Sequence, residues 1–548
     1  MRLPIIAAIV FAELISLAFL FSYHAEWEGG RLRSFLLMDE AMISMNYARS
    51  LAEGCGLVWY CGAEKVEGIT NLGWTLYMTL WHGLGIPSAY AALPILLTGL
   101  LTLGVHIWAS AKAAFLLQGS RAATFTAWGM ALLPLTWVWH GAGIEAGSLA
   151  TLLTLLFLEL ILETPSMLRI ALWTGLGVFI RMDFALWIGA FLLSSLLIRR
   201  TLQIPKVMGF TALSVIAACT AFRWIYYDAW LPNTYFLRVS EVPTLCRIVN
   251  GAMASAFFVI YNLPLIVLGL WGLGKAVGYR IHIIAWIAVT FIYNIYAGGD
   301  LEEVSFSSSR FLFLGITPLF ILASEVGSQM NSFAQVGLLL LIAHGVPLYP
   351  ATIGARWRAL LGPVRQFLWN GYWDEQARPF FFGVKPTRLE GIVPKGSVVA
   401  VGFAGTHPYF NRDYRWIDFF GKNDTQIAHT GHVLYCGAMP YMIYFPGHTR
   451  WGWEKLLKEA DAILDVLGMI NNKRICYEGR DWNLPRCGGW RIFDSLRQRC
   501  ATKTAYVPNR ELFPFPNTAI ANQVCSLFTP SPVPGLWVRK VKAVREGR

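Results

Sequence analysis

The chain has 548 residues, of which 55% are hydrophobic and 14% are charged, and its mean hydropathy is +0.48. Soluble domains carry about 25% charged residues, so this composition excludes an ordinary soluble protein and predicts an integral membrane protein. The net charge of +12 does not indicate nucleic-acid binding, because Lys and Arg lie mainly in short loops and in the tail rather than along a basic stripe. Attraction to anionic lipid headgroups explains this charge, and we expect no nucleic-acid partner.

The first apolar stretch, at 4–23, is longer than the core of a signal peptide, so we expect a membrane helix there rather than a cleaved leader. A spanning helix needs about 20 apolar residues. Further spans are expected at 71–86, 89–117, 122–139, 146–163, 166–180, 183–199, 205–226, 252–274, 280–297, 309–325 and 332–350. The fold class predicted is a polytopic α-helical membrane protein with about 11–13 transmembrane helices.

Charged loop residues predict the orientation of these spans. Basic residues concentrate in cytoplasmic loops, and one set of connections carries Lys112, Arg121, Arg169, Arg199, Arg200, Lys206, Lys275 and Arg280. The loops at the other ends of the spans hold polar clusters and lie on the same side of the membrane as Asp39. We expect this side to be extracytoplasmic. This arrangement needs an odd number of crossings. Because the ranges above number twelve, one of those within 71–139 is expected to be re-entrant or part of its neighbour.

The composition changes near residue 351, where polar residues, Pro, Gly and Trp increase and no long apolar run returns. We therefore divide the chain into a transmembrane domain at 1–350 and an extracytoplasmic α/β domain at 351–548. Residues 396–405 predict a buried strand followed by a glycine turn, and 453–468 predict an amphipathic helix that runs into an apolar segment.

The nine cysteines fit this layout. Cys55 and Cys61 share the first outer loop and are placed to close a small disulfide ring. Oxidising conditions outside the cytoplasm also permit disulfides in the C-terminal domain, where five cysteines leave at least one unpaired or paired elsewhere. Zinc is the competing interpretation, but no C-x-x-C pair occurs, so we expect no metal site.

Asp39 and Glu40 are adjacent carboxylates that begin a predicted helix, whose apolar residues Met42, Met45 and Ala48 recur at helical spacing. Two interpretations are open. Asp39 is of a residue type that caps helices, whereas an acidic pair at a bilayer surface is costly unless it binds a ligand or does chemistry.

Further acids are predicted on the same membrane face, together with arginines. Arg suits phosphate because its donors form a planar fork, and a carboxylate can take a proton from a sugar hydroxyl. Arg181 and Asp183 are equally consistent with a local ion pair, and Pro232 with an ordinary turn. The acids and arginines that we expect to converge are Asp39, Glu145, Asp183, Asp300, Arg181 and Arg310.

Several short segments occur in an order that resembles a known family. They are MDEAMISMNYAR, KVEGITNLGW, GIEA, YDAWLPNTYF, YAGGD with SSRFLF, AVGFAGTHPYFNRDYRWIDFFGKND and PGH. Together they resemble the bacterial C-type (GT-C) glycosyltransferase superfamily, and most closely the terminal β-(1→2)-arabinofuranosyltransferases and their bacterial relatives. The resemblance implies a multi-pass protein of the bacterial inner membrane with an extracytoplasmic C-terminal domain.

The resemblance also implies roles for residues that match the motifs. Asp39 falls at the position of the general base, and Glu40 stands where relatives often have a second Asp. Met182 stands where relatives often have Pro between an Arg and an acid. Donor-phosphate contacts are implied for Arg310, Arg181 and Arg238, and substrate contacts for Glu145, Asp183, Asn233 and Asp300.

The implied reaction moves a sugar, arabinofuranose or a related pentose or hexose, from a polyprenyl monophosphate to a cell-surface glycan, with inversion. Its partners are the lipid-linked donor, the glycan acceptor and membrane lipid. No cofactor is expected, and no metal is needed because the donor is not a nucleotide diphosphate. A flippase or transporter of lipid-linked sugar, and a non-catalytic glycan-binding membrane protein, are the alternatives.

Overall fold

The computed structural model describes residues 2–28, 31–198, 202–240, 242–275, 279–300, 309–344, 386–430, 446–448, 450–464, 523, 526–531 and 536–540. The expected domain boundary at 351 lies outside these residues, as do the tail cysteines.

Apolar helices form the larger part of the described structure. Five are long and apolar enough to cross a membrane: α1 (Arg2–Tyr23), α4 (Leu93–Gln118), α10 (Gln203–Tyr227), α12 (Thr244–Tyr261) and α14 (Arg280–Ala297). A sixth is counted if α6 (Pro134–Gly141) and α7 (Ala146–Ile161), bent by 115°, form one span. Shorter apolar helices are α8 (Met167–Ile180), α9 (Ala185–Ile198), α13 (Leu263–Lys275), α17 (Ile316–Gly327) and α18 (Ser332–His344). The chain is therefore a multi-pass α-helical membrane protein.

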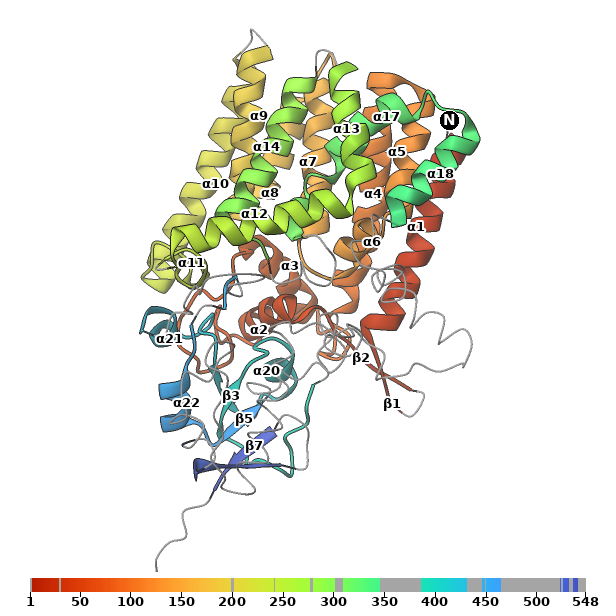
Figure 1. Cartoon of the computed structure of the whole chain (residues 1–548). Coiled ribbons are helices and arrows are strands. Elements are labelled where there is room, and N and C mark those ends of the chain that lie inside the picture. The colour runs from red at the N-terminus through yellow and green to blue at the C-terminus, as the bar shows by residue number, and fades with distance from the viewer. Residues whose placement is uncertain are drawn as a thin grey trace, which may run out of the picture.

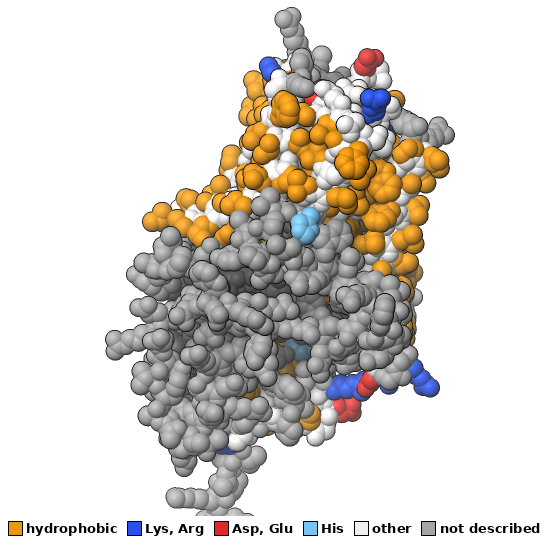
Figure 2. All heavy atoms as spheres, turned by 45° about the vertical axis from the view of Figure 1, so that its right-hand side comes forward, with side chains coloured by type: hydrophobic (Ala, Val, Ile, Leu, Met, Phe, Trp, Pro, Cys, Tyr) orange, Lys and Arg blue, Asp and Glu red, His pale blue; other side chains and the backbone are white. Residues whose placement is uncertain are grey.

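Most of these helices run side by side, and α12 lies across them near one end of the bundle (Figure 1). Below this end in Figure 1 lie α2 (Asp39–Ala52), α3 (Leu72–Gly83) and the C-terminal α/β region. On the face drawn in Figure 2, hydrophobic side chains cover the described surface of the bundle, and charged side chains gather at its two ends. A hydrophobic belt between charged ends is what a bilayer requires.

Four expected spans differ in the structure. The range 309–325 is divided between the four-residue helix α16 (Arg310–Phe313) and α17. The range 71–86 holds α3, whose twelve residues extend about 18 Å and cannot cross roughly 30 Å of hydrocarbon. The range 122–139 is divided between α5 (Ser120–Leu132) and α6, which begins at Pro134, a residue that favours the first turn of a helix. The range 252–274 is divided after Tyr261, between α12 and α13.

The C-terminal region contains a five-stranded sheet in the order β4-β3-β5-β7-β6. The central strand β3 (Val398–Val401) pairs in parallel with β4 (Arg415–Asp418) and β5 (Ala462–Leu464), and β7 (Leu536–Arg539) is antiparallel to β5 and to β6 (Phe528–Pro530). The strand expected within 396–405 is confirmed. The helix expected from 453 is α22 (Trp453–Glu459), and the apolar segment after it forms β5. Short helices α20 (Thr406–Phe410) and α21 (Thr425–Thr430) follow β3 and β4. A two-stranded ribbon, β1 (Ala25–Glu28) with β2 (Arg31–Phe35), follows α1.

Cys55 and Cys61 are joined by a disulfide in the loop after α2. Cys246, in the first turn of α12, is also disulfide-bonded, and its partner lies outside the described residues. Cys219 is a buried free thiol on α10. Glu53 lies close to the Cys55 and Cys61 sulfurs, but these sulfurs are bonded to each other and are therefore not thiolate ligands for a metal.

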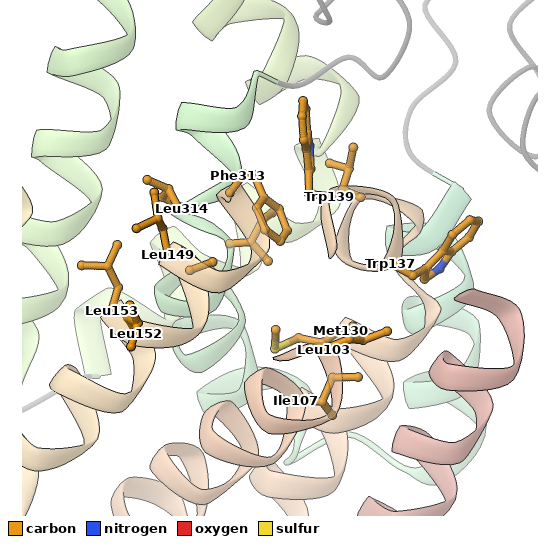
Figure 3. Packing of buried hydrophobic residues seen from close by; sticks show 14 of the residues in the cluster. Leu103, Ile107, Met130, Trp137, Trp139, Leu149, Leu152, Leu153, Phe313 and Leu314 are labelled. Carbon is orange, nitrogen blue, oxygen red and sulfur yellow. The ribbon is translucent and has the colours of Figure 1, made fainter. Parts of the chain in front are cut away.

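A continuous apolar core joins the helices that flank the candidate site. Phe313, in the short helix α16 (Arg310–Phe313), is fully buried. Figure 3 shows it among side chains of α4, α5, α6 and α7, with labelled members Leu103, Ile107, Met130, Trp137, Trp139, Leu149, Leu152 and Leu153. This packing fixes the position of α16, which begins with Arg310.

A polar network crosses the same core. His106 on α4 contacts His140 on α6 at 3.0 Å (Nδ1 to Nε2) and Thr317 on α17 at 2.7 Å, and His140 Nδ1 contacts Thr102 at 3.1 Å. All four imidazole nitrogens thus have a protein partner. The network therefore links α4, α6 and α17 by hydrogen bonds, and it leaves none of these nitrogens available to a substrate.

Candidate active site

Helix α2 presents the acidic pair at its first two positions. Met42, Met45 and Ala48 are buried, as their spacing predicts. The N-cap residue is Met38, and no side chain caps the helix. Asp39 therefore does not cap its own helix, although acids in the first turn do favour the helix dipole.

Both carboxylate oxygens of Asp39 accept hydrogen bonds from the C-terminal region. The amide of Gly405 donates to Oδ2 at 3.2 Å, and the amide of Thr406 donates to Oδ1 at 2.8 Å. These amides belong to the start of α20. Burial raises the pKa of Asp39, although both amides and the charge of Lys422 oppose the increase.

Glu40 has a different environment. It forms ion pairs with Arg310 and with Lys422, whose Nζ lies 3.1 Å from Oε1. Its side chain is 24% exposed, so the pair is not sealed from solvent. Burial alone would raise the pKa of Glu40, but the charges of Arg310 and Lys422 outweigh burial and hold that pKa well below its ordinary value.

Asp300 joins two of the expected phosphate-binding arginines. It accepts from Arg310 Nε at 2.6 Å and from Arg238 Nη2 at 2.9 Å, and it is 1% exposed. Arg238 ends α11 (Asn233–Arg238), and Arg310 begins α16, whose N-cap Ser309 accepts from the amide of Leu312. Residues of distant motifs are thus brought to one point.

Arg181 joins the other two expected acids. Its guanidinium donates to Glu145 at 2.6 Å and to Asp183 at 2.8 Å. Asp183, in the short 3-10 helix η1 (Met182–Phe184), also accepts from the Tyr293 hydroxyl, and Asn71 donates to Glu145 at 2.9 Å. The local Arg181–Asp183 pair is present, but it is part of a larger cluster.

Phe311 connects the two clusters. The guanidinium carbons of Arg181, Arg238 and Arg310 lie 5.2–5.8 Å from its ring centroid, within the range of cation–π attraction. A small cavity beside this ring is lined by Glu145, Arg181, Asp183, Arg310 and Phe311, and by the apolar residues Ala146, Leu149, Phe184, Trp187 and Leu314. Asp39 and Glu40 do not line the cavity. Glu40 is linked to it by its ion pair with Arg310, which does line the cavity. The cavity can hold an anion against Arg181 and Arg310.

Asn233 is engaged by the C-terminal region. Its side-chain amide donates to the backbone carbonyls of Gly421 and Lys422 at 2.7 and 3.1 Å, and it lies 3.3 Å from that of Asp424. Its substrate contact stays a prediction, and its evident role is to hold the loop that contains Lys422.

Sequence reasoning missed four residues of this site: Lys422, His448, Asn71 and Tyr293. The first three stand in segments on which the family resemblance rests, GKND, PGH and GITN. Their position in these segments could have indicated that they belong to the site. Tyr293 lies in an apolar span and carried no such signal.

No family model matches the chain, and no curated protein matches it. Solved structures give remote likenesses. ArnT from Cupriavidus metallidurans in the apo state is 16% identical with a TM-score of 0.44, over 65% of this chain and 64% of ArnT. The Archaeoglobus fulgidus oligosaccharyltransferase in its apo form is 11% identical with a TM-score of 0.47, over 89% of this chain and 71% of that chain. This chain thus spans somewhat less than two thirds of the length of ArnT, and we rest no functional conclusion on these likenesses.

Proposed function

We propose that the protein is a membrane glycosyltransferase of the GT-C type. It moves a sugar, arabinofuranose or a related pentose or hexose, from a polyprenyl monophosphate to a cell-surface glycan. One observation supports this most strongly: two adjacent acids at the end of a membrane bundle have different partners, backbone amides for Asp39 and the cations Arg310 and Lys422 for Glu40, and their pKa values shift in opposite directions. Such divergence is typical of acid and base roles in enzymes.

Asp39 is the general base in this proposal. A raised pKa makes a carboxylate a better proton acceptor, whereas Glu40 stays ionised and orients Arg310 and Lys422. Asp39 takes the proton of the acceptor hydroxyl as the oxygen bonds to the anomeric carbon. The bond from that carbon to the phosphate oxygen breaks, and its electron pair leaves with the phosphate. Attack from the opposite face inverts the configuration.

Arg310 stabilises the departing phosphate, with Arg181 and Arg238 beside it around Phe311. Asp300 fixes the orientation of the guanidinium groups of Arg310 and Arg238. Glu145 and Asp183 fix the orientation of the Arg181 guanidinium group. The remaining proposed substrate contacts, from Asn233 and the oxygens of these acids, lie around the same cluster.

The proposed location is the bacterial inner membrane, with the site and the C-terminal region outside the cytoplasm. The loop charges support this orientation, because basic residues concentrate in cytoplasmic loops. Polyprenyl-linked donor in the outer leaflet would then reach the arginines directly.

The transferase is distinguished from a flippase by purified protein in proteoliposomes that contain a polyprenyl-phosphate sugar. We expect sugar on an added cell-wall glycan, detected by mass spectrometry, and no movement of the lipid between leaflets without acceptor. Translocation without transfer would favour the flippase. Loss of this protein from cells should remove one sugar from the surface glycan.

The pH dependence of transfer is expected to report Asp39. Because burial raises its pKa above the ordinary value of 3.8, Asp39 becomes protonated at a pH above 3.8 and then cannot accept a proton. The value of kcat/KM should therefore fall with decreasing pH, with an inflection above pH 3.8, while Glu40 remains ionised. A profile that is flat to pH 3.8, in protein shown to remain folded, would contradict the assignment.

A further inference from the structure

Lys422 brings a positive charge from the C-terminal region to the charged cluster of the bundle. Its ammonium donates to Glu40 at 3.1 Å, and the residue is 9% exposed. It follows β4, which ends at Asp418 in the sheet. A residue of the sheet region therefore lies beside the proposed base and its neighbour.

The loop that carries Lys422 has a well-defined conformation. Asp418 accepts from the amides of Phe420 and Asn423 at 3.1 and 2.9 Å, and from the Asn423 side chain at 2.8 Å. Gly421 has φ +77°, a conformation that favours glycine. These contacts thus fix the position of the loop that carries Lys422.

The membrane part of the chain holds the same loop. Asn233 donates to carbonyls on the loop, including that of Lys422, and the hydroxyl of Tyr47 on α2 lies 3.0 Å from Asn423 Oδ1. Gly68 approaches so closely that a Cβ there would lie 2.1 Å from the same oxygen. The Lys422 loop is therefore held by contacts from the C-terminal region and from the membrane part of the chain, unlike a loop with a solvated surface lysine.

The charge around Lys422 depends on Asp39. Arg238, Arg310 and Lys422 face Glu40, Asp300 and Asp39, so these six groups are neutral while Asp39 is ionised and carry +1 once Asp39 has taken a proton. His448 lies near Lys422, but burial and the charge of Lys422 lower its pKa to about 3, so it adds no charge near neutral pH. A buried excess of positive charge is costly unless an anion compensates for it.

We propose that Lys422, together with Arg310, binds the phosphate of the lipid-linked substrate, so that the C-terminal region supplies part of the donor site. This proposal rests on the proposed function. Of the three N–H groups of Lys422, one donates to Glu40, and the other two have no hydrogen-bond partner among the described residues. A phosphodiester donor carries one negative charge, and the released monophosphate carries about −1.5 to −2. The contact therefore strengthens as the bond to the sugar breaks.

The test measures lipid binding rather than sugar transfer. Protein in nanodiscs is titrated with a polyprenyl monophosphate and, separately, with the polyprenol that lacks phosphate. We expect wild-type protein to prefer the phosphate. Lys422→Met should weaken binding of the phosphate roughly 10- to 100-fold, the size of a charge-assisted hydrogen bond. Lys422→Arg should retain most of the affinity, and binding of polyprenol should not change.

Lys455→Met is the matched control. Lys455 lies in the same region and pairs with Asp424 at 2.5 Å, and its side chain is 20% exposed. Among the described residues it contacts neither Glu40 nor Arg310, so its loss should leave phosphate binding close to that of wild-type protein. Thermal unfolding of each variant reports whether the fold survives.

A second measurement needs no variant. Polyprenyl monophosphate should slow acylation of the Lys422 amine in wild-type protein, but not that of Lys455, as measured by peptide mass spectrometry. Selective binding that survives in Lys422→Met, or labelling of Lys422 that the lipid does not change, would overturn the role of Lys422. Wild-type protein that does not distinguish the monophosphate from polyprenol would instead contradict the proposed function.

Discussion

Asp39→Asn is expected to lower the rate of sugar transfer by about 10²- to 10⁴-fold, the contribution of a general base. Asn cannot accept the proton of the acceptor hydroxyl, yet its side chain has nearly the same shape. It can still accept one of the two hydrogen bonds that Gly405 and Thr406 donate to Asp39. The measurement is the initial rate with saturating donor, together with binding of the lipid phosphate.

The control for Asp39→Asn is Glu53→Gln. Glu53 is an acid immediately after α2 that also contacts the C-terminal region, through Arg412 at 2.6 Å, and its side chain is 38% exposed. We expect this variant to transfer sugar at a rate close to that of wild-type protein. If Asp39→Asn retained a near-normal rate, Asp39 would not be the base, and Glu40 or His448 would need the same test.

Arg310→Met should lower kcat by about 10²- to 10³-fold, because a preorganised donor to the leaving phosphate is lost. The single change also leaves Asp300, which is 1% exposed, with one fewer cation. Removing one partner of a buried ion pair costs about 3–5 kcal/mol of stability. The double variant Arg310→Met/Asp300→Asn also removes the charge of Asp300. Its stability should therefore return towards that of wild-type protein, whereas its kcat should stay low.

The matched control for the double variant is Arg169→Met/Glu159→Gln. It removes another ion pair with a buried acid, at 2.6 Å, outside the charged cluster of the site. We expect a similar or smaller loss of stability and little loss of kcat. A double variant at Arg310 and Asp300 with normal kcat would show that these residues do not stabilise the leaving phosphate.

Much of the architecture could be predicted from local pattern. The helix that begins with Asp39 and the strand around Val399 follow from the spacing of apolar residues, and composition predicted the membrane helices. The convergence of Glu145 and Asp300 with arginines follows from the placement of their loops on one membrane face. These features depend on periodicity, hydrophobicity and loop charge, which a single sequence contains.

The remaining features depend on contacts between distant segments. Glu40 and Lys422 are 382 positions apart, and no periodic pattern indicates that a loop after β4 reaches the start of α2. The short helix α3 resembled a span because its residues are apolar, but its twelve residues are too few to cross the hydrocarbon. The distinction between Asp39 and Glu40 also required the structure, because their pKa values diverge through burial and through partners that are far away in the sequence.

The central claim is that the acidic pair of α2 and the cations around Phe311 form one site for a lipid phosphate. A structure of the protein in nanodiscs with bound polyprenyl monophosphate tests it most directly. We predict phosphate in contact with Arg310 and Lys422, with the lipid chain directed towards the bundle and Asp39 facing the space left for the sugar. Phosphate bound elsewhere, or Asp39 separated from that phosphate by protein, would contradict the claim.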